Sequence, residues 1–337
     1  MAKFYFNVEM ELNWQNRSVS MVTAEELLKY DLDVIPKYLL MRDILKVDKY
    51  NEEMINIKNK VLETKWVKNI TKLQWKDGSW GRFHSMNTSS KLSITTEVAL
   101  RRLLILGLDK DDEAIQRALI YMKQFLNREL DLRDYKEKKH DWDLLTRLFV
   151  ATWILRIEPS NAEATAIAKD WAKVITYAFS EDKYNREAYK EAYMETHKPQ
   201  KGKVLWGFQN YYLVALLPGF LEPMIESKYL DYIMTEEKGI YYIYDGNLHL
   251  NPVDFSSKEA NRYIYAYELL SRYSCGRIKS QNFINWIKGN ISEDGFWDMG
   301  QTVQDKIQFP LSNSWRKTLN RKIDCTVRIQ RILSQLL

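Results

Sequence analysis

Two kinds of helical segment alternate along the chain, and this alternation is the feature that most limits how it can fold. Residues 94–106 are apolar on most sides and are interrupted mainly by Glu97 and the pair Arg101–Arg102, whereas residues 112–126 carry apolar side chains on one face only. A helix that is apolar nearly all round is buried, and a helix with one apolar stripe lies against a core. The sequence therefore predicts an inner helix followed by an outer helix.

The same order recurs along the rest of the chain. Residues 142–157 are almost wholly apolar and residues 161–179 are two-faced, and further inner helices are expected to begin near residues 36, 204, 256 and 322. An open superhelix needs polar capping repeats at its ends, but the last segment, 322–336, is apolar. We therefore expect an all-α, single-domain α/α toroid over residues 1–337, with about six inner and five to six outer helices and an irregular lead-in over residues 1–22.

Short motifs predict where several elements start. In a capping box, a Ser or Thr and a Glu three residues later satisfy free backbone N–H groups at a helix start. Three segments match this pattern: Thr23–Glu26, Ser160–Glu163 and Ser256–Glu259. Pro36 is expected at the first position of a helix, and segments 51–73 and 204–217 are each expected to form one helix. Residues 239–250, with Asp245–Gly246 between aromatic residues, predict a short β-hairpin.

Charge, cysteine content and the N-terminal sequence limit the cellular setting. The 50 Lys and Arg residues are interspersed among 45 Asp and Glu residues, so no basic surface for nucleic acid is indicated. Only Cys275 and Cys325 are present, which is typical of a reducing compartment. Glu9 and Glu11 lie where a signal peptide needs an apolar stretch, and no apolar run is long enough for a membrane span. We expect a cytoplasmic protein with no nucleic-acid partner, and the sequence indicates no particular protein partner.

Two Asp-Gly turns carry the most specific motif of the chain. The segments LQWKDGSWG, with Gln74 and Trp80, and INWIKGNISEDGFWDMG, with Trp297, resemble the Gln-Trp repeats of squalene cyclases and protein prenyltransferase β subunits. The remainder, including ITTEVALRRLLILGLD and FPLSNSWRKTLNRKIDCTVRIQRIL, resembles bacterial prenyltransferase-like proteins of undefined activity. The resemblance spans roughly residues 30–337. It implies an α/α toroid with a central cavity, in which Gln and Trp side chains tie one helical hairpin to the next.

Two catalytic patterns of related enzymes find incomplete matches. Residues 109–112, Asp-Lys-Asp-Asp, match the D-x-D-D motif with which class II terpene cyclases protonate an alkene. Their position at the start of an outer helix instead predicts helix capping. Asp324–Cys325 resembles part of a prenyltransferase zinc site, but no third ligand accompanies it, and the four histidines lack ligand spacing. We therefore predict no metal site and no cofactor.

His84 and Glu97 are the candidate catalytic pair. His84 follows the first tryptophan turn, and Glu97 lies in the first turn of an inner helix, which in a toroid can face the cavity mouth. A partly buried His–Glu pair can exchange protons with a ligand. The structural alternative is that Glu97 completes a helix cap and His84 forms a hydrogen bond within a loop.

Aromatic and charged residues on or beside the inner helices are candidates for ligand binding. Aromatic faces bind apolar or cationic groups, although core packing is the alternative for each ring. Asp143 and Arg147 are four residues apart and are expected to pair. The candidate ligand-binding residues are Trp142, Asp143, Arg147, Trp153, Trp206, Tyr212, Trp315, Arg316 and Asp324.

The leading functional hypothesis is a protein that binds an apolar or isoprenoid-like small molecule in an aromatic-lined central cavity; the sequence leaves open whether it is an enzyme. One alternative is a non-catalytic scaffold that binds a peptide or protein partner on the ring face. Another is a carbohydrate-processing toroid enzyme, which would need two facing carboxylates in an open cleft.

Overall fold

The chain is all-α, as the sequence predicts. The computed structural model describes residues 20–85, 94–304 and 309–337, and across these ranges it contains helices and no β-strand. The helices are α2 (Ala24–Leu27), α3 (Val34–Leu39), the π-helix η1 (Leu40–Ile44), α4 (Glu52–Glu63), α5 (Lys65–Thr71), α6 (Thr96–Ile105), α7 (Glu113–Leu126), α8 (Trp142–Ile157), α9 (Ala162–Ala178), α10 (Arg186–His197), α11 (Tyr211–Leu216), α12 (Pro223–Thr235), α13 (Lys258–Leu270), α14 (Gly276–Lys279), α15 (Gln281–Gly289) and α16 (Thr318–Leu336).

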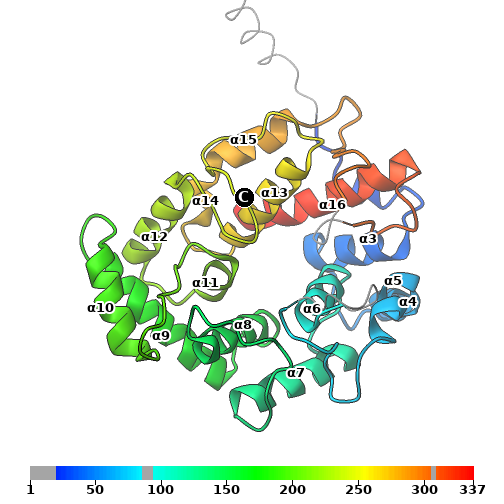
Figure 1. Ribbon diagram of the computed structural model, residues 1–337. Helices are drawn as coiled ribbons and strands as arrows, with labels where there is room; N and C mark the ends of the chain where they lie inside the picture. Colours follow the sequence, from blue (N-terminus) through cyan, green and yellow to red (C-terminus); the bar gives the residue numbers. More distant parts are fainter. Residues whose placement is uncertain (1–19, 86–93, 305–308) are drawn as a thin grey trace, which may run out of the picture.

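Helices with different burial occupy different places in the molecule. In Figure 1, α6, α8, α11 and α13 lie toward the middle of the view, and α7, α9, α10, α12 and α15 lie toward its edge. Helix α8 is buried on nearly all sides and packs against α7, α9 and α11, whereas α7 and α15 bury one face. The apolar periodicity of each segment therefore predicts how deeply it lies.

The last helix packs against the first helices of the described chain. Helix α16 contacts α3 and η1. Arg331 forms an ion pair with Asp43 of η1, with Nε 2.6 Å from Oδ2, and the backbone N–H of Asn313 donates to Asp33 Oδ2 at 2.8 Å. The Gln330 side chain donates to the carbonyl oxygen of Val22 at 2.6 Å. Polar contacts therefore join the two ends of the helical path.

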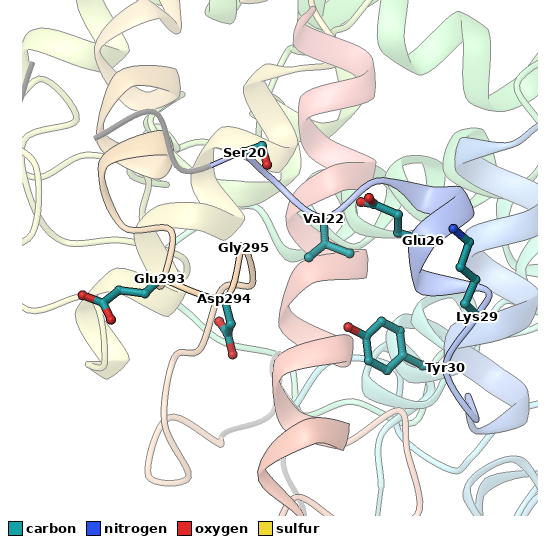
Figure 2. Close-up of a pocket in the computed structure, with 8 residues that line it drawn as sticks. All are labelled: Ser20, Val22, Glu26, Lys29, Tyr30, Glu293, Asp294 and Gly295. Carbon is teal, nitrogen blue, oxygen red and sulfur yellow. The ribbon is translucent and has the colours of Figure 1, made fainter. Parts of the chain in front are cut away.

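Both Asp-Gly turns have a backbone conformation that favours glycine. Gly78 has φ +90° and Gly295 has φ +82°, in the left-handed region that residues with a Cβ rarely adopt. A Cβ at Gly78 would overlap the carbonyl oxygen of Arg117, so the turn lies directly on α7. Gly295 accepts a hydrogen bond from the backbone N–H of Val22 at 3.1 Å, and Figure 2 shows these two residues side by side. Each turn thus docks one hairpin against another segment.

A hollow of about 690 Å³ lies beside the second turn. Figure 2 shows Glu26, Lys29 and Tyr30 of the α2 region on one side and Glu293 and Asp294 on the other. Tyr30 also packs edge-on against Phe296, with ring centroids 5.7 Å apart. The residues that line this hollow come from the α2 region and from the second turn, so the hollow is a groove between these two packed segments.

Thr64 divides the single helix expected over residues 51–73. Its backbone is extended, with φ −63° and ψ 149°, so it ends α4, and its hydroxyl accepts a hydrogen bond from Val67 N–H to start α5. Pro36 is the third residue of its helix and not the first as predicted, because α3 begins at Val34. A Thr with an available hydroxyl favours a helix start over a helix interior.

One of the three predicted capping boxes is confirmed. Thr23 accepts a hydrogen bond from Glu26 N–H, and the Glu26 carboxylate accepts one from Thr23 N–H. The predictions at Ser160 and Ser256 were wrong by one residue, since Asn161 and Ser257 are the N-caps. In each case the following polar side chain reaches the N–H three residues later.

The aromatic segments around residues 204–217 and 239–250 were predicted incorrectly. Only Tyr211–Leu216 is helical, and the β-hairpin does not form. Ile240 and Tyr244 form an isolated antiparallel bridge around Tyr242, which has φ +74°. The backbone N–H of Tyr241 donates to Gln209 and its carbonyl accepts from Tyr211. This pairing with the residues before α11 replaces the expected hairpin. Helix α10 was not predicted.

Candidate functional site

The two acid–base candidates lie within hydrogen-bonding distance of each other. His84 Nδ1 is 2.9 Å from Glu97 Oε2. Tyr212, on α11, places its hydroxyl 2.7 Å from His84 Nδ1 and 2.9 Å from Glu97 Oε2. Three residues that are distant in sequence therefore form one hydrogen-bonded group at the N-terminal end of α6. His84 keeps 22% of its side-chain surface exposed, so the group is reachable from solvent.

A buried carboxylate positions His84. Asp134 accepts hydrogen bonds from three consecutive backbone N–H groups, those of Phe83 at 2.7 Å, His84 at 2.8 Å and Ser85 at 2.6 Å. The backbone N–H of Glu97 donates to the carbonyl oxygen of Phe83 at 3.0 Å, which joins this loop to α6. The loop conformation that presents His84 thus depends on one side chain from another loop.

The electrostatics favour a charged pair. Burial would lower the pKa of His84, but the hydrogen bond and charge of Glu97 outweigh it and raise that pKa above the usual value. Burial would raise the pKa of Glu97, but His84 and the nearby Arg101 lower it. Arg101 Nη2 lies 3.5 Å from Glu97 Oε1. An imidazolium beside a carboxylate can donate or accept a proton with little rearrangement.

Aromatic rings surround this group. Phe149 of α8 stacks on Tyr212 with centroids 3.9 Å apart and lies 4.9 Å from the His84 ring. Tyr242 approaches His84 edge-on at 5.8 Å and is itself 45% exposed. Trp206 lies 6.3 Å from Phe149. The rings form a continuous apolar wall from the buried Tyr212 to the surface.

A hollow of about 310 Å³ adjoins this wall. It is lined by Lys139, His140, Trp206, Gly207, Gln209, Asn210 and Tyr241. Two donor nitrogens of the lining, Trp206 Nε1 and Gln209 Nε2, are buried without a hydrogen-bond partner. Buried donors are nearly always paired, so these two are open positions for an acceptor.

Three of the predicted ligand-binding residues, Trp142, Trp206 and Tyr212, belong to this aromatic region. Trp142 contacts Phe149 edge-on at 6.2 Å. Trp153 is fully buried about three turns after Trp142 on α8, where it packs against Tyr211 with ring centroids 5.9 Å apart. Its indole N–H also has no partner.

The predicted pair Asp143–Arg147 does not form. Asp143 is exposed and pairs instead with Arg128, with Nη2 3.1 Å from Oδ2. Arg147 donates to the carbonyl oxygen of Leu126 at 3.0 Å. Both partners belong to the end of α7 or the residues just after it, where free carbonyl groups and Arg128 compete successfully with an i,i+4 contact.

Trp315, Arg316 and Asp324 lie away from the aromatic hollow. Asp324 is buried and accepts hydrogen bonds from Trp315 Nε1 at 2.6 Å and from the backbone N–H groups of Leu311 and Ser312, each at 2.9 Å. Burial raises its pKa to about 6, although these donors oppose the shift. Arg316 is exposed. The contacts of Asp324 fasten the segment before α16, which is a structural role.

The remaining sequence motifs also have structural surroundings. Asp112 precedes α7 and accepts hydrogen bonds from Lys58 Nζ and from Asp109 N–H, each at 2.7 Å, while Asp111 pairs with Lys49 at the surface. Burial raises the pKa of Cys325 to about 12, so this thiol stays protonated. No group of three potential metal ligands occurs within the described residues.

Several residues of the site were not predicted from the sequence. Asp134, Gln209, Tyr241 and Tyr242 all lie between helices, and the last three fall in segments whose conformation was predicted incorrectly, so only tertiary structure brings them to the site. A signal did exist for Arg101, because a charge within a nearly apolar helix needs a partner or water. That signal identifies the residue but not what it contacts.

Comparison of the chain with protein-family models, with curated proteins and with solved structures finds no match. Across the ranges that the structure describes, no helix is long and apolar enough to cross a bilayer. The resemblance to the toroid families therefore stays a prediction.

Proposed function

We propose that the helices form an α/α toroid and that the protein binds a small apolar molecule carrying an acceptor oxygen, of the isoprenoid-alcohol kind, in the hollow beside Trp206. The observation that carries this proposal is the pair of unpartnered donors in its lining, Trp206 Nε1 and Gln209 Nε2. A buried donor without a partner costs about 1–3 kcal/mol, which an acceptor on a ligand removes.

The size and composition of the hollow fit such a ligand. Its volume of about 310 Å³ lies at the lower end of the range for small-molecule sites. Trp206 and Tyr241 supply apolar faces, and their ring centroids are 6.5 Å apart. Trp206 also contacts Phe149, which in turn stacks on the buried ring of Tyr212. A ligand with an apolar body and one polar end matches this gradient from polar rim to aromatic wall.

Acid–base chemistry on the bound molecule is a second candidate function. The observation that favours it is the group formed by His84, Glu97 and Tyr212, which shares the Phe149 wall with the hollow. The lining of the hollow contains no carboxylate, which supports an apolar ligand over a carbohydrate. The aromatic hollow likewise favours a small ligand over a peptide scaffold.

Binding of farnesol, an uncharged isoprenoid alcohol, tests the proposal through tryptophan fluorescence and calorimetry. We expect saturable binding to the unmodified protein and binding weakened about tenfold or more by Trp206→Ala. Trp75→Ala is the matched control, because Trp75 is 51% exposed on the first Asp-Gly turn. Native mass spectrometry of the purified protein searches in parallel for a retained ligand. Absence of farnesol binding together with absence of a retained apolar molecule contradicts the proposal.

If the second candidate holds, a ligand recovered in this way is converted by the protein, and Glu97→Gln abolishes the conversion. Tyr212→Phe should lower the rate while leaving the stacking on Phe149 intact. Conversion at an unchanged rate by Glu97→Gln rules the pair out as the acid–base group, whatever the outcome of the binding test.

A further inference from the structure

Four inner helices converge on the guanidinium of Arg101. Its carbon Cζ lies 5.7 Å from the ring centroid of Trp153 on α8, 5.0 Å from that of Tyr211 on α11 and 6.0 Å from that of Tyr265 on α13. In Figure 1 these four helices lie toward the middle of the view. A cation therefore lies among aromatic rings of these helices, in a region that differs from the aromatic hollow near His140.

Two further arginines extend this cationic region. Arg156, in the last turn of α8, has Nε and Nη1 buried with no hydrogen-bond partner. Arg272, just after α13, donates to the carbonyl oxygen of Ala215 at 3.2 Å. Arg156 Cζ lies 5.4 Å from the Trp153 ring centroid, the same ring that Arg101 approaches, and the acceptor of Arg272 lies on α11, four residues after Tyr211. Among the described residues, no carboxylate lies within ion-pair distance of Arg156 or Arg272.

The carboxylates closest to the region have other partners. Glu97 contacts His84 and Tyr212 as well as Arg101. Glu268, on α13, lies 4.0 Å from Arg328. The C-terminal ends of α8 and α11 contribute partial negative charge. Nε and Nη1 of Arg156 nevertheless remain without a hydrogen-bond partner.

Neutral donors lie beside the arginines. The hydroxyls of Tyr211 and Tyr265 are buried and have no hydrogen-bond partner. Planar guanidinium groups match the oxygens of phosphate in paired hydrogen bonds, and tyrosine hydroxyls donate to the remaining oxygens. Arg272 is exposed whereas Arg156 is only partly exposed, so an ion from solvent meets Arg272 first.

We propose that Arg101, Arg156 and Arg272, with the hydroxyls of Tyr211 and Tyr265, form a binding site for a phosphate-type dianion. The ion is either inorganic phosphate or the phosphate group of an organic ester. Arg101 also contacts Glu97 of the His84 group, but none of these five residues lines the hollow beside Trp206. The site therefore stands independently of the farnesol proposal.

Titration followed by ³¹P NMR and calorimetry tests this site, at constant ionic strength in chloride. Inorganic phosphate and phenyl phosphate are the two probes, and they distinguish a free ion from an ester. We expect saturable binding of at least one, weakened tenfold or more by Arg156→Gln and by Arg272→Gln. Arg316→Gln is the matched control, because it removes the same charge from an exposed position.

Thermal melts give a second measurement. The bound probe should raise the melting temperature of the unmodified protein and of Arg316→Gln, and the rise should be absent in Arg156→Gln and Arg272→Gln. If Arg156→Gln does not fold, the exposed Arg272 alone decides. Failure of both probes to bind, or equal binding by the unmodified protein and Arg272→Gln, overturns the proposal.

Discussion

Trp80 and Trp297 are held by the same pair of hydrogen bonds, although they lie in opposite halves of the chain. Each indole N–H donates to the carbonyl oxygen ten residues earlier, Trp80 to Ile70 at 2.8 Å and Trp297 to Ile287 at 2.7 Å. Each backbone N–H donates to a threonine hydroxyl on the helix that follows, Thr96 of α6 at 2.9 Å and Thr326 of α16 at 3.1 Å. Each tryptophan thereby ties the helix before its turn to the helix after it, and the two turns are a structural repeat.

Replacing either tryptophan with alanine should therefore destabilise the fold. Both rings are nearly fully buried, and truncation of a buried Trp costs about 3–5 kcal/mol. Urea unfolding measures the change. Trp75→Ala in the first turn is the control and should cost less than about 1 kcal/mol, because that ring is half exposed and stacks with the exposed Arg133, whose Cζ lies 5.0 Å from the ring centroid. Unchanged stability in Trp80→Ala would refute the structural role of the repeat.

The all-α class and the depth of most helices could be predicted because periodicity reports local burial directly. Helices α7, α8 and α9 lie close to their predicted bounds for this reason. The loops that build the site carry no such signal. The segment 240–244 takes its conformation from hydrogen bonds to Gln209 and Tyr211, which are distant in sequence. Its aromatic composition favours extended backbone and so predicts a hairpin, but composition does not show which segment the backbone pairs with.

The site could be predicted only in part. The position of Glu97 in the first turn of an inner helix pointed toward His84, and the contact exists. The third member, Tyr212, was assigned to ligand binding instead, because nothing in the sequence shows that α11 faces α6. For Asp143 and Arg147, helical spacing alone predicted a pair, but contacts at the end of α7 replaced it.

Asp134 should control the position of His84. Asp134→Ala removes the acceptor of three N–H groups, and we expect a loss of roughly 3 kcal/mol in the free energy of unfolding, since hydrogen bonds to a charged group are each worth about 1.5–3 kcal/mol. Asp134→Asn keeps one acceptor oxygen and should lie between the two. In Asp134→Ala, NMR titration should show the pKa of His84 falling toward its usual value, because the charge of Asp134 helps to raise it. Asp131→Asn, exposed in the same loop, is the control. An unmoved His84 titration in Asp134→Ala would exclude a positioning role.

The His84–Glu97 pair predicts a defined pH window of stability. The pKa of His84 is raised from 6.5, so its contribution is complete below that value and is lost as the pH rises through the folded-state pKa. The pKa of Glu97 is lowered from 4.5, so its contribution is complete above that value and is lost as the pH falls through the folded-state pKa. The stability difference between the unmodified protein and His84→Gln should therefore be largest between pH 4.5 and 6.5, as measured by urea unfolding across pH. His249→Gln, at an exposed position, is the control, and a difference that does not vary with pH contradicts the charged pair.

Asp111 and Asp112 are adjacent but should respond differently to replacement by alanine. Asp112 is buried and pairs with Lys58, whose side chain is 19% exposed, and it also accepts from Asp109 N–H. Asp112→Ala should therefore cost roughly 2 kcal/mol, because it leaves the Asp109 N–H without its acceptor and removes the shorter ion pair of Lys58, which keeps Gly107 O at 3.0 Å and Asp109 at 3.5 Å. Asp111 pairs with Lys49 in solvent, and an exposed pair of this kind contributes little to stability, so Asp111→Ala should leave stability nearly unchanged. Thermal and urea unfolding of both variants measure the contrast. If Asp111→Ala keeps its stability but loses conversion of a ligand, then the D-x-D-D motif acts as an acid after all and its assignment to structure fails.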